Sequence, residues 1–290
     1  MSVTRTYPGA LPFLKMQGLG NDFVVIDRRG QGNVIGMCSR SARALADRRL
    51  GIGCDQVAVL RDDSEGDDGH DGSVDAAVDF WNADGSPADA CGNATRCIGR
   101  LLMAENGSDV VRVRTGRGVL SVHATGDGEY SVNMGRPMRH WSEIPLARDV
   151  DPEALPIDGT PVAVSMGNPH CVFIVDEHGL SGPEERGPEI ECHPLFPERT
   201  NVEFVHVVNR NAIRVRFWER GTGVTPASGS GSCAAAVAAH LRKLTERRVS
   251  VQLDGGSLEI DWRDDGVWMK GPANKVYSGR LDPELLESLE

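Results

Sequence analysis

The sequence predicts an α+β protein of two similar domains, each with an antiparallel, barrel-like β-sheet around one central α-helix. Short runs of alternating or β-branched apolar residues recur along the 290-residue chain, which is the pattern of short strands. Each half contains one strongly apolar helical segment, preceded by a loop with Cys or Ser beside Gly. Many short strands with one apolar helix in each half favour a sheet-around-helix architecture that occurs twice.

Length and composition agree with this class. A chain of 290 residues suffices for two domains that each bury a core, and 40% hydrophobic with 25% charged residues is typical of a soluble globular protein. The net charge of -11 argues against nucleic acid or an anionic membrane as partner. The seven Cys residues are scattered, as reduced thiols of cytosolic proteins are, and no apolar run is long enough to span a membrane. We therefore expect a cytoplasmic location.

The first half is expected to begin with two strands around a Gly-Leu-Gly-Asn-Asp turn, followed by a short helix. Two strands on either side of an acidic loop then lead to the first apolar helix, and three short strands follow it. The expected ranges are 13–27 for the strand pair, 39–47 for the helix, 57–60 and 74–81 for the strands beside the loop 61–73, and 110–115, 118–124 and 129–134 for the last strands.

The second half repeats this plan after a boundary at Gly135-Arg136-Pro137. Its second helix, residues 234–241, is almost entirely Ala and Val and should be buried on all sides. A Pro-rich stretch at 187–196 is expected to be a connector. The expected strands are 161–164, 171–175, 202–209, 212–218, 249–253, 257–262 and 266–270. The predicted domains are thus residues 1–134 and 135–275.

The first apolar helix is preceded by Ala90-Cys91-Gly92-Asn93, which places a thiol at a helix N-terminus. The unpaired N–H groups and the positive dipole end of a helix favour thiolate over thiol there. Cys91 is therefore a candidate acid, base or nucleophile. Ser228-Gly229-Ser230 precedes the second helix in the same way, so Ser228 holds the equivalent position.

Two helix N-termini that face one cleft would supply many N–H donors and a positive potential. An α-carboxylate is the natural ligand of such a site. The residues therefore predict a small carboxylic acid as substrate, and an amino acid fits best.

Seven short motifs, in order and spread over nearly the whole chain, resemble those of the diaminopimelate epimerase family. Singly each is weak, but together at compatible spacing they are specific. They are Gly20-Asn21-Asp22-Phe23, Asp55-Gln56, Asn82-Ala83-Asp84-Gly85, Cys91-Gly92-Asn93 with Arg96-Cys97, Gly167-Asn168-Pro169-His170, Thr200-Asn201-Val202-Glu203-Phe204 and Trp218-Glu219-Arg220-Gly221.

The resemblance implies interconversion of LL- and meso-2,6-diaminopimelate with no cofactor and no metal. In that family, two cysteines flank the substrate Cα, one removing the α-proton and the other returning a proton on the opposite face. The resemblance also implies a homodimer, and a C-terminal segment, residues 276–290, that returns to the first domain. It assigns catalytic roles to Cys91, the Ser228 position, His170 and Glu219, and substrate contacts to Asn21, Gln56, Asn82, Gly92, Asn93, Asn168, Asn201, Glu219, Arg220, Gly229 and Ser230.

Taken singly, most of these residues have a simpler interpretation. Asn residues in loops usually form turns, and a His after Pro is usually an ordinary loop residue. Cys38, Cys54, Cys97, Cys171 and Cys192 are expected to be structural, because free Cys behaves as a small buried hydrophobe. Arg220 is different, since Arg binds a carboxylate in bidentate fashion.

Ser228 departs from the family, which has Cys at this position. A hydroxyl is a far weaker acid than a thiol, so Ser needs a neighbouring group to act as a base, and no His or Lys is adjacent in sequence. Three interpretations follow: an epimerase inactivated by substitution, a natural epimerase that uses Ser, or a racemase or dehydratase of another amino or imino acid that uses Cys91 alone. A non-catalytic diaminopimelate-binding relative is a fourth.

Overall fold

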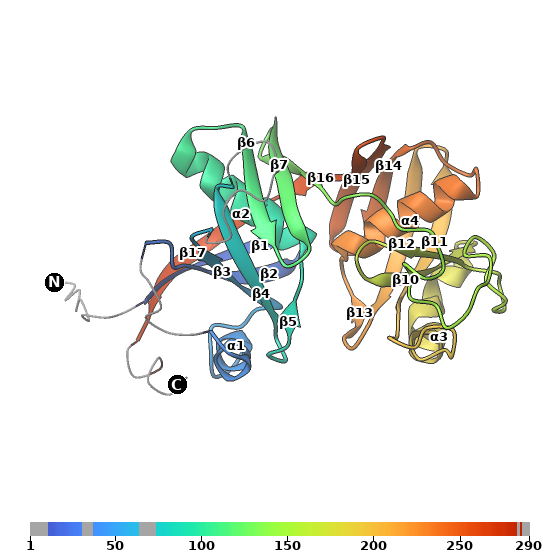
Figure 1. Cartoon of the computed structure of the whole chain (residues 1–290), viewed down its shortest axis with the longest axis horizontal. Coiled ribbons are helices and arrows are strands. Elements are labelled where there is room, and N and C mark those ends of the chain that lie inside the picture. The colour runs from blue at the N-terminus through green and yellow to red at the C-terminus, as the bar shows by residue number, and fades with distance from the viewer. Residues whose placement is uncertain (1–10, 31–36, 64–73, 283–284, 286–290) are drawn as a thin grey trace. The chain divides into compact units, whose positions relative to one another are not determined.

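The chain folds into two compact α+β units in the structure, a computed structural model that describes residues 11–30, 37–63, 74–282 and 285. The first unit comprises residues 1–128 and 273–290, and the second comprises residues 129–272. Each has a β-sheet with one long helix (Figure 1). Residues 64–73 of the expected acidic loop lie outside the described residues. None of the described helices is long and apolar enough to cross a membrane.

The sheet of the first unit runs in the order β17–β1–β2–β3–β4–β6–β7, and β5 shares one edge of β4 with β6. Helix α1 connects β2 to β3, and α2 connects β5 to β6. The elements are β1 Leu11–Gly18, β2 Asn21–Asp27, α1 Ser39–Ala46, β3 Gln56–Arg61, β4 Ala76–Asn82, β5 Pro87–Ala88, α2 Gly92–Asn106, β6 Val110–Thr115, β7 Gly118–Gly126 and β17 Asn274–Leu281.

The sheet of the second unit runs in the order β9–β10–β11–β12–β14–β15–β16–β8, and β13 shares one edge of β12 with β14. The elements are β8 Glu129–Asn133, β9 Val162–Ser165, β10 Pro169–Val175, the 3₁₀ turn η1 His178–Ser181, α3 Gly182–Glu191, β11 Asn201–Asn209, β12 Ala212–Glu219, β13 Gly223–Thr225, α4 Gly229–Leu241, β14 Arg248–Leu253, β15 Gly256–Arg263 and β16 Gly266–Pro272.

The two units repeat one topology. In the first unit β2 pairs in parallel with β3 and β4 with β6, and in the second β10 pairs in parallel with β11 and β12 with β14. The predicted antiparallel sheets therefore also contain parallel strand pairs. The physical reason is that a helix follows β2, β5, β10 and β13, and a helical crossover returns the chain to the same end of the sheet.

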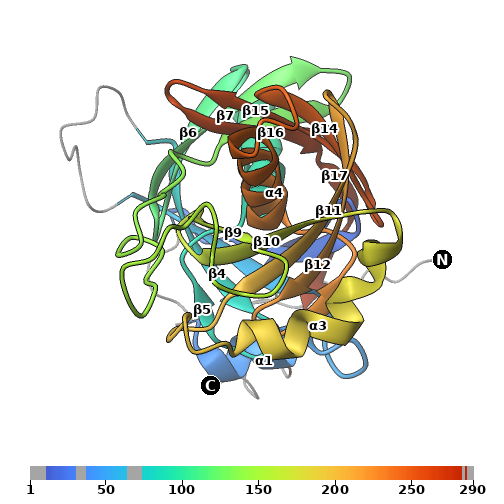
Figure 2. The ribbon, with the colours of Figure 1, turned by 90° about the vertical axis from the view of Figure 1, so that its right-hand side faces the viewer.

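The central helices fit the strands around them closely. Cys233 and every residue from 234 to 239 are buried, as expected for a helix enclosed on all sides. Helix α4 contacts β9, β10, β11, β12, β14, β15 and β16, and Figure 2 shows it in the middle of these strands. In the first unit α2 contacts β1, β2, β6 and β7. A Cβ at Gly99 of α2 would lie 2.5 Å from Val122 of β7, so only Gly permits this approach.

Two sequence expectations change in the structure, and part of a third lies outside the described residues. The boundaries expected at 134/135 and 275/276 move to 128/129 and 272/273, because β8 pairs with β16 in the second unit and β17 pairs with β1 in the first. The Pro-rich stretch expected as a connector begins inside α3. That helix accommodates its prolines at the N-terminal turn (Pro183) and in its interior (Pro188). Of the C-terminal segment 276–290, residues 283–284 and 286–290 lie outside the described residues.

Candidate active site

Cys91 is the N-cap of α2. Its backbone is extended, with φ −142° and ψ 111°, and its Sγ accepts a hydrogen bond from the N–H of Ala94 at 3.5 Å. The N–H of Thr95 donates to the Cys91 carbonyl at 2.8 Å and closes the first helical turn. The thiol is half-buried and lies at the positive end of the helix, where an anionic sulfur is stabilised.

Asn21 lies beside this thiol. It begins β2 after a two-residue turn in which Leu19 and Gly20 both have positive φ, 57° and 85°. Its Oδ1 lies 4.0 Å from the Cys91 Sγ and accepts a hydrogen bond from Asn93 Nδ2 at 3.2 Å. The turn thus brings an amide from one end of the sheet to the first turn of α2.

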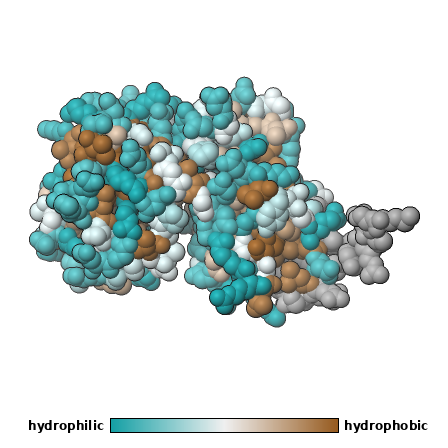
Figure 3. Space-filling model, turned by 180° about the vertical axis from the view of Figure 1, so that it is seen from behind, coloured by the Kyte–Doolittle hydropathy of each residue, from teal (hydrophilic) through white to brown (hydrophobic). Residues whose placement is uncertain are grey.

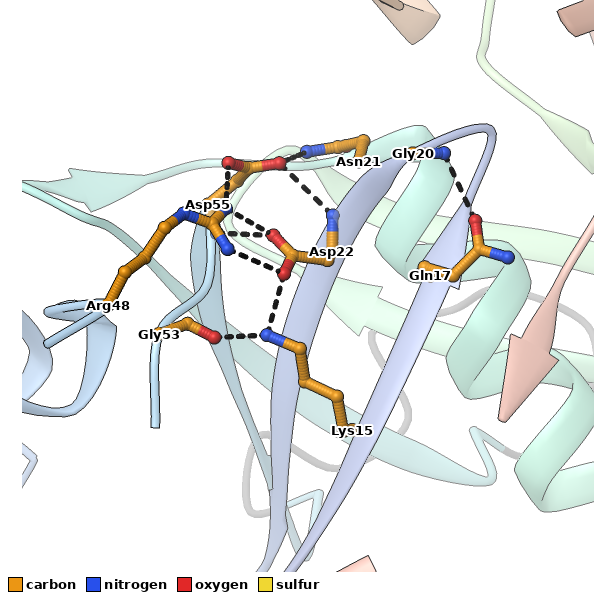
Figure 4. Close-up of polar contacts among 8 residues, drawn as sticks. All are labelled: Lys15, Gln17, Gly20, Asn21, Asp22, Arg48, Gly53 and Asp55. Carbon is orange, nitrogen blue, oxygen red and sulfur yellow. Dashed lines mark hydrogen bonds and ion pairs between the residues drawn. The ribbon is translucent and has the colours of Figure 1, made fainter. Parts of the chain in front are cut away.

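A charged network holds Asn21 in place (Figure 4). Its Nδ2 donates to Asp55 at 2.9 Å, and Asp55 is tied to Asp22 through two backbone N–H groups and through Arg48. The buried Lys15 ammonium lies 2.7 Å from Asp22 and also donates to the Gly53 carbonyl. Burial opposes ionisation of Asp22, but hydrogen bonds from Arg48 and Lys15 outweigh it and lower its pKa to about 2.

Gln56 and Asn82 lie opposite each other on β3 and β4. Gln56 Nε2 donates to Asn82 Oδ1 at 2.8 Å, and Asn82 Nδ2 donates to the Ser86 hydroxyl at 3.0 Å. Because Gln56 follows Asp55 in the chain, this pair belongs to the same cluster as Asn21. The structure therefore brings Asn21, Cys91, Gly92 and Asn93 together at the start of α2, and Gln56 and Asn82 form a second pair in the same unit.

Ser228 is the N-cap of α4, in the same role as Cys91. Its Oγ accepts from the N–H of Gly231 at 3.3 Å and donates to Glu219 Oε2 at 2.9 Å. The other oxygen of Glu219 accepts from the Thr225 hydroxyl at 2.6 Å. Ser228 is only 3% exposed. The neighbouring group that a reactive serine requires is thus a carboxylate from the end of β12.

Asn168, His170 and Ser230 form a second group in this unit. Asn168 Nδ2 lies 3.5 Å from the Ser230 hydroxyl, and its Oδ1 lies 3.0 Å from His170 Nε2. His170 Nδ1 contacts Glu203 Oε1 at 2.7 Å, and both side chains are fully buried. Burial raises the pKa of Glu203, although the attraction of His170 opposes this; the nearby Glu219 carboxylate raises it further.

Asn201 and Arg220 lie side by side at the ends of β11 and β12. Asn201 Nδ2 donates to the Pro169 carbonyl at 3.0 Å, and its Oδ1 accepts from the backbone N–H of Arg220 at 2.9 Å. The exposed Arg220 guanidinium donates to the Glu198 carbonyl at 3.0 Å. Asn201 thus joins Arg220 to the strand that carries His170. With Gly229 at the start of α4, all expected site residues of the second unit belong to one local cluster.

Several residues of these clusters were not predicted. Asp22, Asp55, Arg96 and Glu203 lie inside the family-like motifs, so their positions were visible although their partners were not. Arg96 is fully buried and donates to Asn93 Oδ1 at 2.8 Å. Lys15, Arg48 and Thr225 carry no signal in the sequence, because only the fold brings them to their carboxylate partners.

The other thiols divide into two groups. Cys54, Cys97, Cys171 and Cys233 are buried, and burial raises the pKa of Cys54 to about 11 and that of Cys97 to about 12. Cys38 and Cys192 are exposed, so the expectation that they pack as hydrophobes was wrong. Cys38 precedes α1 as its N-cap, and hydrogen bonds from Ser41 lower its pKa.

Comparison with known sequences points to one family. The sequence profile described as diaminopimelate epimerase matches residues 13–140 and 162–276. A protein named diaminopimelate epimerase from Acidiphilium cryptum is 44% identical over 283 residues, which cover 96% of this chain and 98% of the relative. One from Phenylobacterium zucineum is 47% identical over 279 residues, covering 93% and 97%.

Solved structures share the fold at much lower identity. A PhzF-family phenazine biosynthesis protein from Enterococcus faecalis has a TM-score of 0.63 and 14% identity, covering 94% of this chain and 99% of its own. A hydroxyproline epimerase from Agrobacterium vitis, solved with bound trans-4-hydroxy-L-proline, has a TM-score of 0.66 and 13% identity, covering 99% and 96%. At such identities the likeness establishes the fold alone.

Proposed function

Because the chain belongs to the diaminopimelate epimerase family, we propose that Cys91 and Ser228 exchange the α-proton of diaminopimelate on opposite faces of its Cα. The protein is an isomerase that converts LL-2,6-diaminopimelate to meso-diaminopimelate, a step of lysine biosynthesis. Of the functions weighed from the sequence, a racemase or dehydratase of another amino or imino acid is not favoured, and neither is a binding protein without activity.

In the proposed mechanism a residue on one face of the substrate Cα acts as base, and a residue on the opposite face acts as acid. Cys91, as a thiolate at the N-terminus of α2, takes the α-proton of one epimer, and the group at the N-terminus of α4 returns a proton from the other side. The negative charge that develops on the substrate is stabilised by the N–H groups at the starts of the helices, at Gly92, Asn93, Gly229 and Ser230. We expect no cofactor and no metal, so activity should survive dialysis against a chelator.

The single observation that carries this proposal is the hydrogen bond from Ser228 to Glu219, 2.9 Å long. When Ser228 acts as base, its Oγ takes the substrate proton while its own hydroxyl proton passes to Glu219 Oε2. When it acts as acid, both transfers reverse. The charge therefore rests on a carboxylate instead of an alkoxide, which removes the main objection to serine at this position.

The amides of both units are proposed to hold the rest of the substrate. Asn21 and Gln56 would line the binding site. The distal carboxylate and amino group would be bound by Asn82, Asn168, Asn201 and Arg220, with Glu219 also near the ligand. His170 would have its catalytic role at a position beside Asn168. A substrate without a second amino acid end has no use for these distal contacts, which is why diaminopimelate fits better than a monocarboxylic amino acid.

A homodimer in the cytoplasm is proposed for the assembly and location. Among the described strands β17 forms a ladder with β1 alone, and it exposes Val276 and Tyr277. An edge strand with exposed apolar side chains is a ready surface for a second copy. In Figure 3 apolar side chains are visible on the faces of both units.

The test is α-proton exchange of LL- and meso-diaminopimelate in D₂O, followed by NMR together with the epimer ratio. Exchange with inversion supports the two-base proposal, and both should fall strongly in Ser228→Ala. Exchange of one epimer without inversion would show Cys91 as a lone base and overturn the role of Ser228. Absence of exchange together with absence of ligand binding would overturn the substrate assignment for this chain.

A further inference from the structure

A buried carboxylate that the proposed mechanism does not use lies at the end of α3. This helix packs against β11, β12 and β13, and Figure 2 shows it beside β12. Its last residue, Glu191, is only 5% exposed. Burial of a charge costs free energy unless hydrogen bonds or opposite charges compensate it. Glu191 therefore needs partners that compensate its charge.

The partners lie on either side of the dipeptide Glu219-Arg220. Glu191 Oε2 accepts a hydrogen bond from the Trp218 indole N–H at 2.6 Å, and Oε1 accepts one from the backbone N–H of Gly221 at 2.9 Å. Oε1 also accepts from the Arg199 guanidinium. We call the bonds from Trp218 and Gly221 the Glu191 clamp, because one carboxylate binds the residue before and the residue after the dipeptide.

The indole of Trp218 is also held by packing. A Cβ at Gly187 of α3 would lie 2.5 Å from its Cγ, and a Cβ at Gly223 of β13 would lie 3.6 Å from its Cη2. The absence of a side chain at Gly187 therefore lets the helix approach the ring this closely. Because the ring lies against both the helix and the short strand, it gives the carboxylate a fixed partner.

The turn that follows the indole is short. The N–H of Thr222 donates to the Glu219 carbonyl at 3.0 Å, and Gly221 between them has a positive φ of 76°. The bond from the Gly221 N–H to Glu191 ties the backbone of this turn to the end of α3. The Glu191 clamp thus joins the end of β12 to a helix outside the turn.

Only a carboxylate satisfies these partners. The indole N–H, the backbone N–H and the guanidinium are all donors, and a carboxylate accepts at both of its oxygens. A Gln side chain has a single accepting atom, so its NH₂ group would face the N–H of either Trp218 or Gly221. A buried donor without an acceptor is costly. The change Glu191→Gln therefore breaks the Glu191 clamp on one side while it keeps the shape of the side chain.

The first unit has a Trp at the matching place without an acceptor for it. Trp81 lies near the end of β4 as Trp218 does near the end of β12, and each is followed by a residue of the proposed site. The Trp81 indole N–H is buried and has no hydrogen-bond partner within the described parts of the chain. The fold therefore tolerates this Trp without an acid beside it.

The position of Glu191 also has a counterpart in the first unit. Gln56 and Asn201 occupy matching places, because each begins the second strand of a parallel pair, β2–β3 or β10–β11. Ala46, the last residue of α1, and Glu191, the last residue of α3, are equally far from them along the chain. A methyl group thus matches the carboxylate, and the acid belongs to the unit that carries the Ser228 hydroxyl.

We infer that Glu191 is a positioning residue for the reaction: its clamp holds Glu219 at the distance from Ser228 at which a proton can pass between them. Ser228 Oγ and Glu219 Oε2 are 2.9 Å apart. A displacement of about 1 Å at a reacting group can lower a rate about 100-fold. The inference rests on the proposed function, because the proton transfer from Ser228 to Glu219 belongs to that mechanism.

The experiment compares Glu191→Gln in the native chain and in the Ser228→Cys background. A thiol ionises near neutral pH unaided, so the second background depends less on the place of Glu219. Glu184→Gln is the matched control. Glu184 is another carboxylate of α3, but it is half exposed and pairs with Arg216 of β12 instead of with the turn.

Steady-state kinetics with diaminopimelate is the first readout. We expect Glu191→Gln to lower kcat at least about tenfold in the native chain and less than about threefold in the Ser228→Cys background. Glu184→Gln should leave kcat within about twofold in both, as for an exposed ion pair. A merely structural role of Glu191 would lower kcat equally in the two backgrounds. Equal losses would therefore overturn the inference.

Hydrogen exchange followed by ¹⁵N NMR reads the Glu191 clamp directly. The Trp218 indole signal is assigned by its loss in Trp218→Phe, and the Trp81 indole is the internal reference. In Glu191→Gln the Trp218 indole N–H or the Gly221 N–H should exchange faster with solvent, because the amide leaves one of them without an acceptor. Unchanged exchange of both groups would overturn the inference.

If Glu191→Gln does not fold, Trp218→Phe carries the kinetic test. It removes one bond of the Glu191 clamp and leaves the bond from Gly221. Its loss of kcat should again be larger in the native chain than in the Ser228→Cys background, and equal losses would overturn the inference alone. A native chain without activity on diaminopimelate would instead overturn the proposed function, and this inference with it.

Discussion

Ser228 donates its hydroxyl hydrogen to Glu219, whereas the residue that matches Glu219 in the first unit, Asn82, accepts a hydrogen bond from Gln56. Both residues directly follow a Trp at the end of the matching strands β12 and β4. The repeat therefore places a carboxylate beside the Ser228 hydroxyl, at the position where the first unit has an amide. A hydroxyl needs a base to take its proton, and a thiol does not.

The first prediction is that loss of the Glu219 carboxylate lowers kcat more when residue 228 is Ser than when it is Cys. Glu219→Gln should lower kcat about 100-fold or more in the native chain, because Gln cannot receive the Ser228 proton. In the Ser228→Cys background the same change should cost about tenfold or less, since a thiol ionises near neutral pH unaided. Ser228→Cys alone should raise kcat at least about tenfold. Epimerisation rates of the four proteins provide the measurement.

Thr225→Val is the control for this cycle. It removes the hydrogen bond to Glu219 Oε1 without touching Oε2, the proton-accepting oxygen, so its effect on kcat should be alike in both backgrounds. Equal losses from Glu219→Gln with Ser and with Cys would contradict a relay through the carboxylate.

Local signals predicted much of the fold and the site. The Ala-rich run 234–241 and the Gly-Asn motif after Cys91 determine helices and caps through near neighbours, and the structure has them at these places. Helix α3 was missed because Pro188 in its interior usually breaks a helix. Packing against β11, β12 and β13 stabilises it.

Long-range partners could not be predicted in the same way. Lys15 and Asp22 meet because β1 pairs with β2, and Ser228 meets Glu219 because the chain between them forms the short strand β13. Such contacts depend on strand register, which one sequence does not determine at the level of single atoms. The parallel pairings were missed for the same reason.

The second prediction concerns thiol reactivity. Iodoacetamide at neutral pH should modify Cys91, Cys38 and Cys192, the three thiols that are not buried, and diaminopimelate should protect Cys91 alone. Peptide mass spectrometry reads each site separately. Cys97 and Cys171 should stay unmodified, because burial raises the pKa of both.

A chain with Cys38→Ser and Cys192→Ser serves as the control, since it leaves Cys91 as the accessible thiol without altering the proposed site. Before labelling, this variant should retain full activity. On treatment with iodoacetamide its activity should fall at the rate at which Cys91 is modified. Slow labelling of Cys91 compared with Cys192 of the native chain would speak against an activated thiol at the start of α2.

The third prediction concerns stability in acid. Asp22 has its pKa lowered from 3.8 to about 2 in the folded protein, so the folded state binds fewer protons than the unfolded state in this range. Its contribution is fully present above about pH 4 and is lost as the pH falls toward about 2. Urea unfolding between pH 2 and 7 should show this loss in the native chain. The loss should be smaller in Asp22→Asn, which is already less stable at pH 7.

Asp79→Asn is the matched control, because Asp79 forms an ion pair with Arg61 in the same unit but is about half exposed. Exposed pairs contribute little to stability, so this variant should follow the native curve. A curve of Asp22→Asn that parallels the native one down to pH 2 would show that the Lys15 and Arg48 contacts do not hold the carboxylate ionised.

The fourth prediction tests the space shared by Gly231 and Glu203. Gly231→Ala should destabilise the protein by about 1–3 kcal/mol, because the new methyl group meets Glu203 Oε1 and the Phe217 ring at 2.9 Å. In the Glu203→Ala background the same change should cost clearly less, since the carboxylate is gone. Urea unfolding of the four proteins gives the coupling free energy of the two sites.

The Phe217 contact provides an internal check on this cycle, because it is present in both backgrounds. A cost of Gly231→Ala that does not depend on residue 203 would assign the whole clash to Phe217. Gly231 would then be required by the aromatic ring under α4 and not by the carboxylate. A strong coupling would instead mean that Gly231 leaves the space in which the Glu203 carboxylate lies beside His170. Apolar packing alone does not explain a buried acid at this place.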